Sequence, residues 1–315
     1  MITTTTLNAA IDKTYYVKQF KLGASHRATE VFAEAGGKGI NVARTLLELG
    51  ADPYAMGFLG GNNGSFIQDE LDKQGIKHDF IRVSGESRIN LNIIDESDYS
   101  STEVLESGPV ISVDELEQFR TKIAAQSKRT PWMVCSGSLP RGVALSTYAE
   151  LIEIARNNGT KVFLDTSGEA LRSSIQAKPF FIKPNEKEIA ELTGQSVADE
   201  DGLFANIHAL MNQGIACVTV SLGEKGSITG YQGRLYRATV PRLEIVNTVG
   251  CGDAFVAGMV VGFSQLKSIE ECIRLATATG SANALTQSAG YVQMEEVERI
   301  KKIVNIEEIQ WTSSK

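Results

Sequence analysis

Two glycines, a cysteine and an aspartate stand together just before an apolar segment at 256–263. The stretch reads Asn-Thr-Val-Gly-Cys-Gly-Asp-Ala-Phe and covers residues 247–255. Main-chain amides at glycines can approach an anion closely, and a helix start adds the positive end of its dipole. A bound phosphate would repel Asp253, unless this carboxylate has to accept a proton from an attacking hydroxyl. Taken alone, a glycine-rich turn with an aspartate at a helix start explains the pattern equally well.

A second glycine-rich segment also leads into a helix pattern. It reads Gly-Gly-Lys-Gly-Ile-Asn-Val-Ala and covers residues 36–43. Phe32 stands where a Walker A loop needs its first glycine, and Val42 stands where a dinucleotide fingerprint needs its third. The backbone can still approach a ligand closely. Lys38 and Asn41 are about one helical turn apart, so both could contact the phosphate or hydroxyls of that ligand.

The segment after the β-rich run at 180–182 offers phosphate and metal ligands. Its position predicts that it lies beyond the carboxyl end of a strand, where α/β sheets bind ligands. Lys183 could contact a phosphate, while Asn185 and Glu188 supply oxygen atoms of the kind that suits Mg²⁺, usually through its waters. The same Asn185 and Glu188 also fit a helix capping box, which needs no metal.

The remaining polar candidates stand in loops or at the ends of strands. Ser138 follows a strand and would face the same sheet edge, whereas residues 221–226 resemble a hairpin turn on local grounds. Arg88 supplies a planar phosphate-binding fork beside Asn90, or is a solvated surface arginine. Asp12 could accept hydrogen bonds from sugar hydroxyls, or could cap a turn.

These residues are positioned by short β-rich runs that alternate with amphipathic helix patterns. This rhythm predicts βα units and a mainly parallel sheet. Two stretches, about 13–35 and 88–106, alternate apolar and polar residues without a helix between them, and predict a small β layer or a pair of edge hairpins. Because no linker or repeat divides the chain, we expect one domain over residues 1–315.

Composition excludes several classes of function. The net charge is −7 and no basic block appears, which argues against a nucleic-acid partner. The longest apolar stretch, 255–263, is about half the length that spans a bilayer, and the first residues lack the pattern of a signal peptide. The four cysteines have neither zinc-site nor dithiol spacing, as is typical of reduced thiols. We therefore expect a cytoplasmic protein without a membrane partner.

The order and spacing of these segments resemble the phosphofructokinase B branch of the ribokinase-like sugar kinases. The resemblance covers roughly residues 1–310, and segments 35–50 and 248–255 are similar to the two signatures of that family. It implies a three-layer α/β/α fold with a mainly parallel, Rossmann-like sheet. It also implies a small β-sheet lid, formed here by the two alternating stretches, which can serve as the interface of a homodimer.

The resemblance implies roles for individual residues, with ATP as phosphoryl donor and Mg²⁺ as its metal. Asp253 would be the catalytic base, and the amides of Gly250, Cys251 and Gly252 would form an anion hole. The sugar-phosphate side would comprise Asp12, Arg27, Gly37, Lys38, Asn41, Arg88, Asn90 and Ser138. The nucleotide side would comprise Lys183, Asn185, Ser221, Gly223, Gly226, Gly252 and Asn283, with Asn185 and Glu188 near the metal through water.

Cys251 departs from the family pattern, which usually has Ala between the two glycines. The anion hole uses the backbone amide at this position, so we expect the mechanism to survive the change. A thiol at a helix start can have a lowered pKa, and we take reactivity of Cys251 toward oxidants as a hypothesis.

Two segments, 37–43 and 88–90, resemble 1-phosphofructokinases and tagatose-6-phosphate kinases more than ribokinases or adenosine kinases. Lys38 and Arg88 would pair with a substrate that already carries a phosphate. Fructose 1-phosphate, giving fructose 1,6-bisphosphate, is the first expectation, and tagatose 6-phosphate, giving tagatose 1,6-bisphosphate, is the alternative. A non-catalytic sugar-phosphate sensor would not need Asp253. A nicotinamide-dependent oxidoreductase would need a complete dinucleotide fingerprint.

Overall fold

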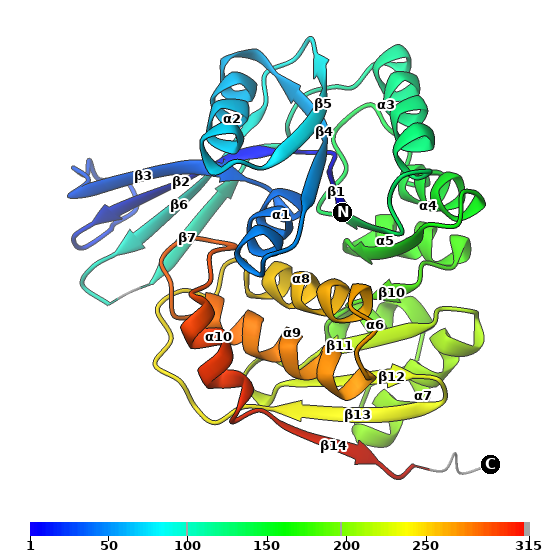
Figure 1. Ribbon diagram of the computed structural model, residues 1–315. Helices are drawn as coiled ribbons and strands as arrows, with labels where there is room; N and C mark the ends of the chain where they lie inside the picture. The colour runs from blue at the N-terminus through cyan, green and yellow to red at the C-terminus, as the bar shows by residue number, and fades with distance from the viewer. Residues whose placement is uncertain (99, 196, 312–315) are drawn as a thin grey trace.

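The larger sheet forms the centre of the molecule (Figure 1). The computed structural model describes residues 1–98, 100–195 and 197–311. Within these residues the sheet has ten strands in the order β14-β13-β12-β11-β10-β9-β8-β1-β4-β5. The strands from β11 to β5 in this order run parallel, and β12, β13 and β14 continue the sheet antiparallel. Their bounds are β1 Ile2–Thr6, β4 Pro53–Gly60, β5 Lys77–Val83, β8 Trp132–Ser136, β9 Lys161–Asp165, β10 Phe181–Ile182, β11 Cys217–Ser221, β12 Ser227–Tyr231, β13 Arg234–Thr239 and β14 Asn305–Ile309.

Helices cover both faces of this sheet and make three layers. One face carries α1 Lys38–Glu48, α2 Gly61–Gln74, α8 Cys251–Ser264, α9 Ile269–Asn283 and α10 Met294–Lys301. The other face carries α3 Val113–Gln126, α4 Thr147–Asn157, α5 Gly168–Ser174, α6 Glu186–Thr193 and α7 Glu200–Asn212. Successive strand residues point to opposite faces, so Val134 packs on the α8 side while Met133 and Cys135 pack on the α4 side. Because helices cover both faces of the sheet, the strands carry apolar side chains on both sides.

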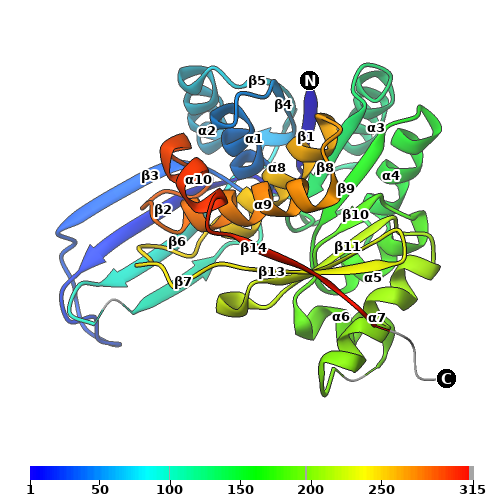
Figure 2. The same ribbon diagram turned by 60° about the horizontal axis from the view of Figure 1, so that its bottom comes forward.

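A second, four-stranded sheet projects from the main body and is visible at the left of Figures 1 and 2. Its strands are β2 Ala10–Val17, β3 Glu30–Gly36, β6 Arg88–Asp95 and β7 Ser101–Leu105, in the order β3-β2-β6-β7. β2 and β6 run parallel, so Ala10 and Arg88 lie together at its base beside the main sheet. The predicted α/β/α architecture with a small second sheet is confirmed. Among the described residues, no helix has the length and apolar character needed to cross a membrane.

Candidate active site

The first turn of α8 is open to an anion. Gly250 precedes the helix with φ of 82°, and a Cβ there would lie 2.9 Å from the Cβ of Ala289. Only glycine avoids both the strain and the clash. Since Gly250 has no side chain to cap the helix, amides of the first turn remain available for a negatively charged ligand. A Cβ on Gly252 would lie 3.1 Å from Nζ of Lys183, so the flexible end of this lysine reaches the same turn.

Asp253 stands in this turn and is 5% exposed. Its Oδ2 accepts a hydrogen bond of 2.9 Å from Nδ2 of Asn41, which comes from α1. Burial raises the pKa of Asp253 to about 6, although the positive charge of Lys38 opposes this rise. A carboxylate with a pKa just below neutral is suited to accept a proton from a hydroxyl at physiological pH. The structure thus gives Asp253 the properties of a general base.

Asp165, at the end of β9, joins two lysines and was missed by the sequence analysis. Its Oδ2 lies 3.0 Å from Nζ of Lys38, and its Oδ1 lies 3.5 Å from Nζ of Lys183. Burial raises the pKa of Asp165, but the two lysines more than offset this effect and hold its pKa below the usual range. The signal was present in the sequence, because a carboxylate directly follows the β-rich run 161–164 at the edge where strands present ligand-binding residues.

The predicted sugar-phosphate residues gather where the second sheet meets the main sheet. Nδ2 of Asn90 donates to Oδ1 of Asp12 at 2.8 Å. Nε of Arg88 donates to the main-chain oxygen of Asn8 at 3.1 Å, and Nδ2 of Asn8 donates to Oγ of Ser138 at 3.2 Å. The structure therefore brings Asp12, Arg88, Asn90 and Ser138 together. It adds Asn8, which the sequence analysis did not assign.

The start of α1 completes this side of the site. Gly37 precedes the helix with φ of 104°, a conformation that favours glycine, and a Cβ there would lie 2.8 Å from Cγ2 of Thr6. Lys38 and Asn41 follow in the first turns, so the lysine reaches Asp165 while the amide reaches Asp253.

Arg27 lies apart from the other predicted substrate residues. It stands in the loop between β2 and β3, and the amide of Thr29 in this loop donates to the main-chain oxygen of Tyr16. Tyr16 is four residues along β2 from Asp12, which corresponds to about 13 Å. Arg27 lies beyond this point, at the outer end of the second sheet, so one chain does not bring it to its own site.

The predicted nucleotide residues lie on two adjacent segments. Asn185 and Ser221 form a parallel bridge, and the amide of Ser221 donates to the main-chain oxygen of Pro184 at 3.1 Å. The capping box is formed, because the side chains of Asn185 and Glu188 each accept from the other's amide at 2.9 Å. Residues 223–225 form a short turn between the antiparallel strands β11 and β12, as the hairpin interpretation predicts. Gly226 follows with φ of 89°.

A base, an open helix start and several cations are thus assembled at one sheet edge. The family model described as "pfkB family carbohydrate kinase" matches residues 5–296. This chain belongs to the pfkB family of carbohydrate kinases. As a kinase of this family it takes its phosphoryl group from ATP.

Individual members of the family are similar over nearly the whole length. A tagatose-6-phosphate kinase of Staphylococcus epidermidis is 35% identical over 98% of this chain and 100% of its own length. The crystal structure of phosphofructokinase-2 from Escherichia coli in complex with potassium matches with a TM-score of 0.91 at 28% identity, over 96% of this chain and 98% of that one. A Thermotoga maritima structure described as a possible 1-phosphofructokinase matches with a TM-score of 0.90 at 27% identity, over 98% and 100%.

Asn283 anchors two loops beside the start of α8. It is fully buried at the end of α9. Its Nδ2 donates to the main-chain oxygen of Val249 at 2.8 Å, and its Oδ1 accepts from the amide of Gly290 at 2.7 Å. Both ends of the amide therefore hold the loops beside Gly250. Its predicted position near adenine stays a prediction.

The expectation of a low pKa at Cys251 is wrong. The thiol is half-buried, with Sγ 3.6 Å from Nδ2 of Asn283 and 3.8 Å from the main-chain oxygen of Asn247. Burial raises the pKa of Cys251, and the negative charge of Asp253 adds to this rise. The hydrogen bond from Asn283 opposes the rise without reversing it, so the thiol is mostly protonated at neutral pH and a poor nucleophile.

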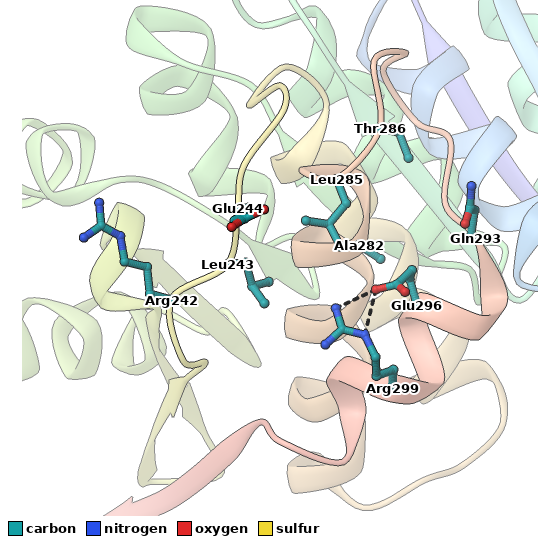
Figure 3. Close-up of a pocket in the computed structure, with 9 residues that line it drawn as sticks. All are labelled: Arg242, Leu243, Glu244, Ala282, Leu285, Thr286, Gln293, Glu296 and Arg299. Atoms are coloured by element: carbon teal, nitrogen blue, oxygen red, sulfur yellow. Dashed lines mark hydrogen bonds and ion pairs between the residues drawn. The ribbon is translucent and has the colours of Figure 1, made fainter.

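The carboxylates of the site do not line the groove drawn in Figure 3. This groove has a volume of about 510 Å³ and lies between the loop after β13 and helices α9 and α10. Its lining includes Arg242, Glu244 and Arg299, and Arg299 is already paired with Glu296. The candidate active site lies instead between the base of the second sheet and the first turn of α8.

Proposed function

We propose that this carbohydrate kinase phosphorylates a ketohexose phosphate, with fructose 1-phosphate, giving fructose 1,6-bisphosphate, as the first candidate. The observation that carries the proposal is the buried Asp253, whose pKa of about 6 suits a base, at an open helix start beside Lys183. The positive charge of Lys38 acts on this base, and Arg88 at the base of the second sheet supplies a further cation for a phosphate that the substrate already carries.

The proposed reaction moves one proton and one phosphoryl group. Asp253 takes the proton of the acceptor hydroxyl while the oxygen attacks the γ-phosphorus of ATP in line. The new P–O bond forms as the bond to ADP breaks, so the products are a sugar bisphosphate, ADP and a protonated Asp253 that releases its proton to solvent. Amides at residues 250–252 stabilise the charge on the transferring group.

Recognition of the sugar phosphate is assigned to the base of the second sheet. Asp12 and Asn90 lie within hydrogen-bond distance of each other and are only half-buried, so both can contact sugar hydroxyls. Arg88 has a rigid planar fork that can bind a phosphate with two parallel hydrogen bonds. Closure of the second sheet over this base would exclude water during transfer.

Magnesium fits the residues on the nucleotide side. Glu188 offers carboxylate oxygens and Asn185 an amide oxygen, both of the hard type that this ion prefers. No cluster of three acidic, histidine or cysteine side chains suited to a metal occurs among the described residues. We therefore assign Mg²⁺ to contacts through water, with the nucleotide phosphates as its main ligands. When bound, the ion supplies charge neutralisation for the phosphates.

Tagatose 6-phosphate is the second candidate substrate. The tagatose-6-phosphate kinase of Staphylococcus epidermidis favours it, because it shares 35% of its residues with this chain over its full length. The test measures ATP turnover with fructose 1-phosphate, tagatose 6-phosphate, fructose 6-phosphate, free fructose and ribose. Preference for one ketohexose phosphate supports the proposal and names the substrate. Preference for a free sugar contradicts the roles of Arg88 and Lys38, and no turnover with any of the five contradicts the proposed substrate class.

We also propose a homodimer formed through the second sheet. Its outer strands β3 and β7 expose apolar side chains: Phe32 is 43% exposed and Leu105 is 61% exposed. Exposed apolar side chains of this kind are typical of a protein–protein interface. A second copy would also bring its own Arg27 to the site that one chain leaves without it.

Mixing two inactive variants tests this dimer. Arg27→Ala removes the donated cation and Asp253→Asn removes the base, so each alone is expected to turn over poorly. In a mixed dimer, the Asp253→Asn chain donates its intact Arg27 to the active site of the Arg27→Ala chain, and activity should return. Phe32→Glu in both chains should abolish this recovery and halve the mass in sedimentation. Additive, unrecovered activity would contradict the shared site.

A cytoplasmic location is part of the same proposal. ATP as donor and four free thiols are both consistent with a reducing, ATP-containing compartment.

A further inference from the structure

Arg44 of α1 is a buried arginine to which the reaction above gives no role. It is 1% exposed. Its Nη1 donates to Oδ1 of Asn41 at 3.2 Å and to the main-chain oxygen of Ala289 at 2.7 Å. Its Nη2 donates to the main-chain oxygen of Ala35 at 2.6 Å, and its guanidinium lies 4.7 Å from the ring centre of Tyr291. Its Nε donates to Oε1 of Gln74 at 3.2 Å. An arginine so deeply buried is costly to desolvate, and the four acceptors around it offset that cost.

The hydrogen bond from Arg44 determines how the side-chain amide of Asn41 is oriented. An asparagine side chain has one accepting and one donating end, and the two ends are nearly identical in shape. Arg44 can only donate, so the oxygen of Asn41 must face it. The NH₂ group is then directed to Asp253, where it donates at 2.9 Å. Asn41 is 4% exposed, so its orientation depends on these two partners rather than on bulk water.

We propose that Arg44 is a positioning residue that holds the Asn41 amide in the orientation that donates to Asp253. A rotated amide would place its oxygen against Oδ2 of the carboxylate, and two acceptors at this distance repel each other. The effect of Arg44 on catalysis rests on the proposed role of Asp253 as the base. The orientation itself does not, since it follows from the contacts of Asn41.

The same arginine connects this orientation to both sides of the site. Ala35 belongs to β3 of the second sheet, and Ala289 belongs to the loop after α9 whose next residue is held by Asn283. The base is therefore tied, through two side chains, to the root of the sheet that carries the substrate residues. Displacement of either segment would loosen the donor on Asp253.

The pKa of Asp253 reports whether the hydrogen bond from Asn41 is formed. A donor to the ionised carboxylate favours ionisation, so losing the Asn41 donor raises the pKa of Asp253 further. The other charged groups that face it are Lys38, Lys183 and Asp165, of which the lysines favour ionisation and the aspartate opposes it. Arg44 also faces Asp12 and Glu34, whose pKa values would rise as well without it. The measurement must therefore resolve Asp253 individually.

The experiment follows the carboxyl carbon of Asp253 by NMR in unliganded protein labelled with ¹³C at aspartate, with Asp253→Asn identifying its signal. Arg44→Met removes the donors, and Arg44→Lys keeps a charge and a donor without the fork. We expect the titration midpoint to move up by about 0.5 pH unit or more in Arg44→Met and by less in Arg44→Lys. The acid limb of the kcat profile should move in the same direction.

A matched control separates this effect from loss of stability. Arg274 of α9 also donates to a main-chain oxygen, that of Val304, but does not contact Asn41. Arg274→Lys should lower stability without moving the midpoint of Asp253.

Asn41→Leu provides the second test. It tests the role of the Asn41 donor even if Arg44→Met does not fold. This variant cannot donate, so the midpoint should rise, and adding Arg44→Lys to it should produce little further change. An unchanged midpoint in Asn41→Leu, or a full extra shift from Arg44→Lys in that background, would overturn the proposal. If the midpoint moves but Asp253→Asn keeps near-normal turnover, the orientation holds and the proposed function fails.

Discussion

Two buried aspartates, one at the start of α8 and one in the second sheet, have pKa values that are shifted in opposite directions. Asp253 at the start of α8 is 5% exposed, and burial raises its pKa to about 6. Asp95 at the outer end of β6 is 6% exposed, yet hydrogen bonds from the hydroxyl and amide of Ser97 and the amides of Phe20 and Gln19 lower its pKa to about 2. In Asp95 the hydrogen-bond donors outweigh burial, whereas in Asp253 burial outweighs the single donor and the nearby lysines.

This difference separates a reactive group from a structural one. Asp253 has one side-chain donor, Asn41, and leaves its other oxygen without a hydrogen bond from the described residues. Asp95 is surrounded by donors and joins the β2–β3 loop to the β6–β7 turn. At the candidate active site, the buried carboxylate of Asp253 is able to take a proton, whereas the carboxylate of Asp95 in the second sheet holds two loops together. Four predictions test this contrast, from the largest expected effect to the smallest.

Exchange of each aspartate for asparagine should separate the two regions by turnover. Asp253→Asn removes the base, so kcat should fall by about 10³-fold while ATP binding, measured by calorimetry, is retained. Asp95→Asn is the matched control and should keep kcat within a few-fold. Near-normal turnover in Asp253→Asn would remove this residue from the role of base.

Loss of the cation at the base of the second sheet should affect substrate binding rather than the base. In Arg88→Ala, we expect KM for the sugar phosphate to rise by about 10- to 100-fold, since a charge-assisted pair with phosphate is lost. KM for ATP should hardly change, because its proposed ligands lie on the segments after β10 and β11 and not on the second sheet. An equal rise in both KM values would instead indicate a general disturbance of the fold, with Arg88→Lys as the conservative control.

The pH profile should report Asp253 and not Asp95. The base acts in its ionised form, so kcat/KM should fall about tenfold per pH unit below about 6 and level off above it. Asp95 stays ionised until pH approaches 2 and contributes nothing to this limb. A profile that is flat between pH 5 and 7 would show that the base has another identity.

Thermal stability should respond to the two substitutions with opposite sign. The pKa of Asp253 is raised on folding, so its ionised form destabilises the fold above about pH 6, and that cost disappears as pH falls. Asp253→Asn should therefore raise Tm by about 2–4 °C at pH 8 and by about half as much at pH 5, because the cost appears between the unfolded pKa near 4 and the folded pKa of about 6. The pKa of Asp95 is lowered, so its contribution is present above pH 4 and Asp95→Asn should lower Tm at both pH values. Scanning calorimetry of both variants checks the signs.

Much of the fold could be predicted because its signals are local. The alternation of β-rich and helical patterns indicated the parallel sheet, and the two stretches without helices indicated the second sheet. Two glycine-rich segments marked the starts of α1 and α8, since glycine is required wherever a backbone with positive φ meets a close neighbour. Asp253 stood out because a carboxylate beside an anion site is unfavourable without a chemical role.

The arrangement of side chains around the base needed the tertiary structure. Asp165 meets Lys38 and Lys183 only because the end of β9, the start of α1 and the segment after β10 lie side by side. Arg27 is separated from Asp12 only because β2 carries the chain outward. The sequence alone determined which residue types were available and on which elements they lie. Burial and long-range contacts decided their charge states, since the desolvation that raises the pKa of Cys251 and Asp253 comes from segments distant in the chain.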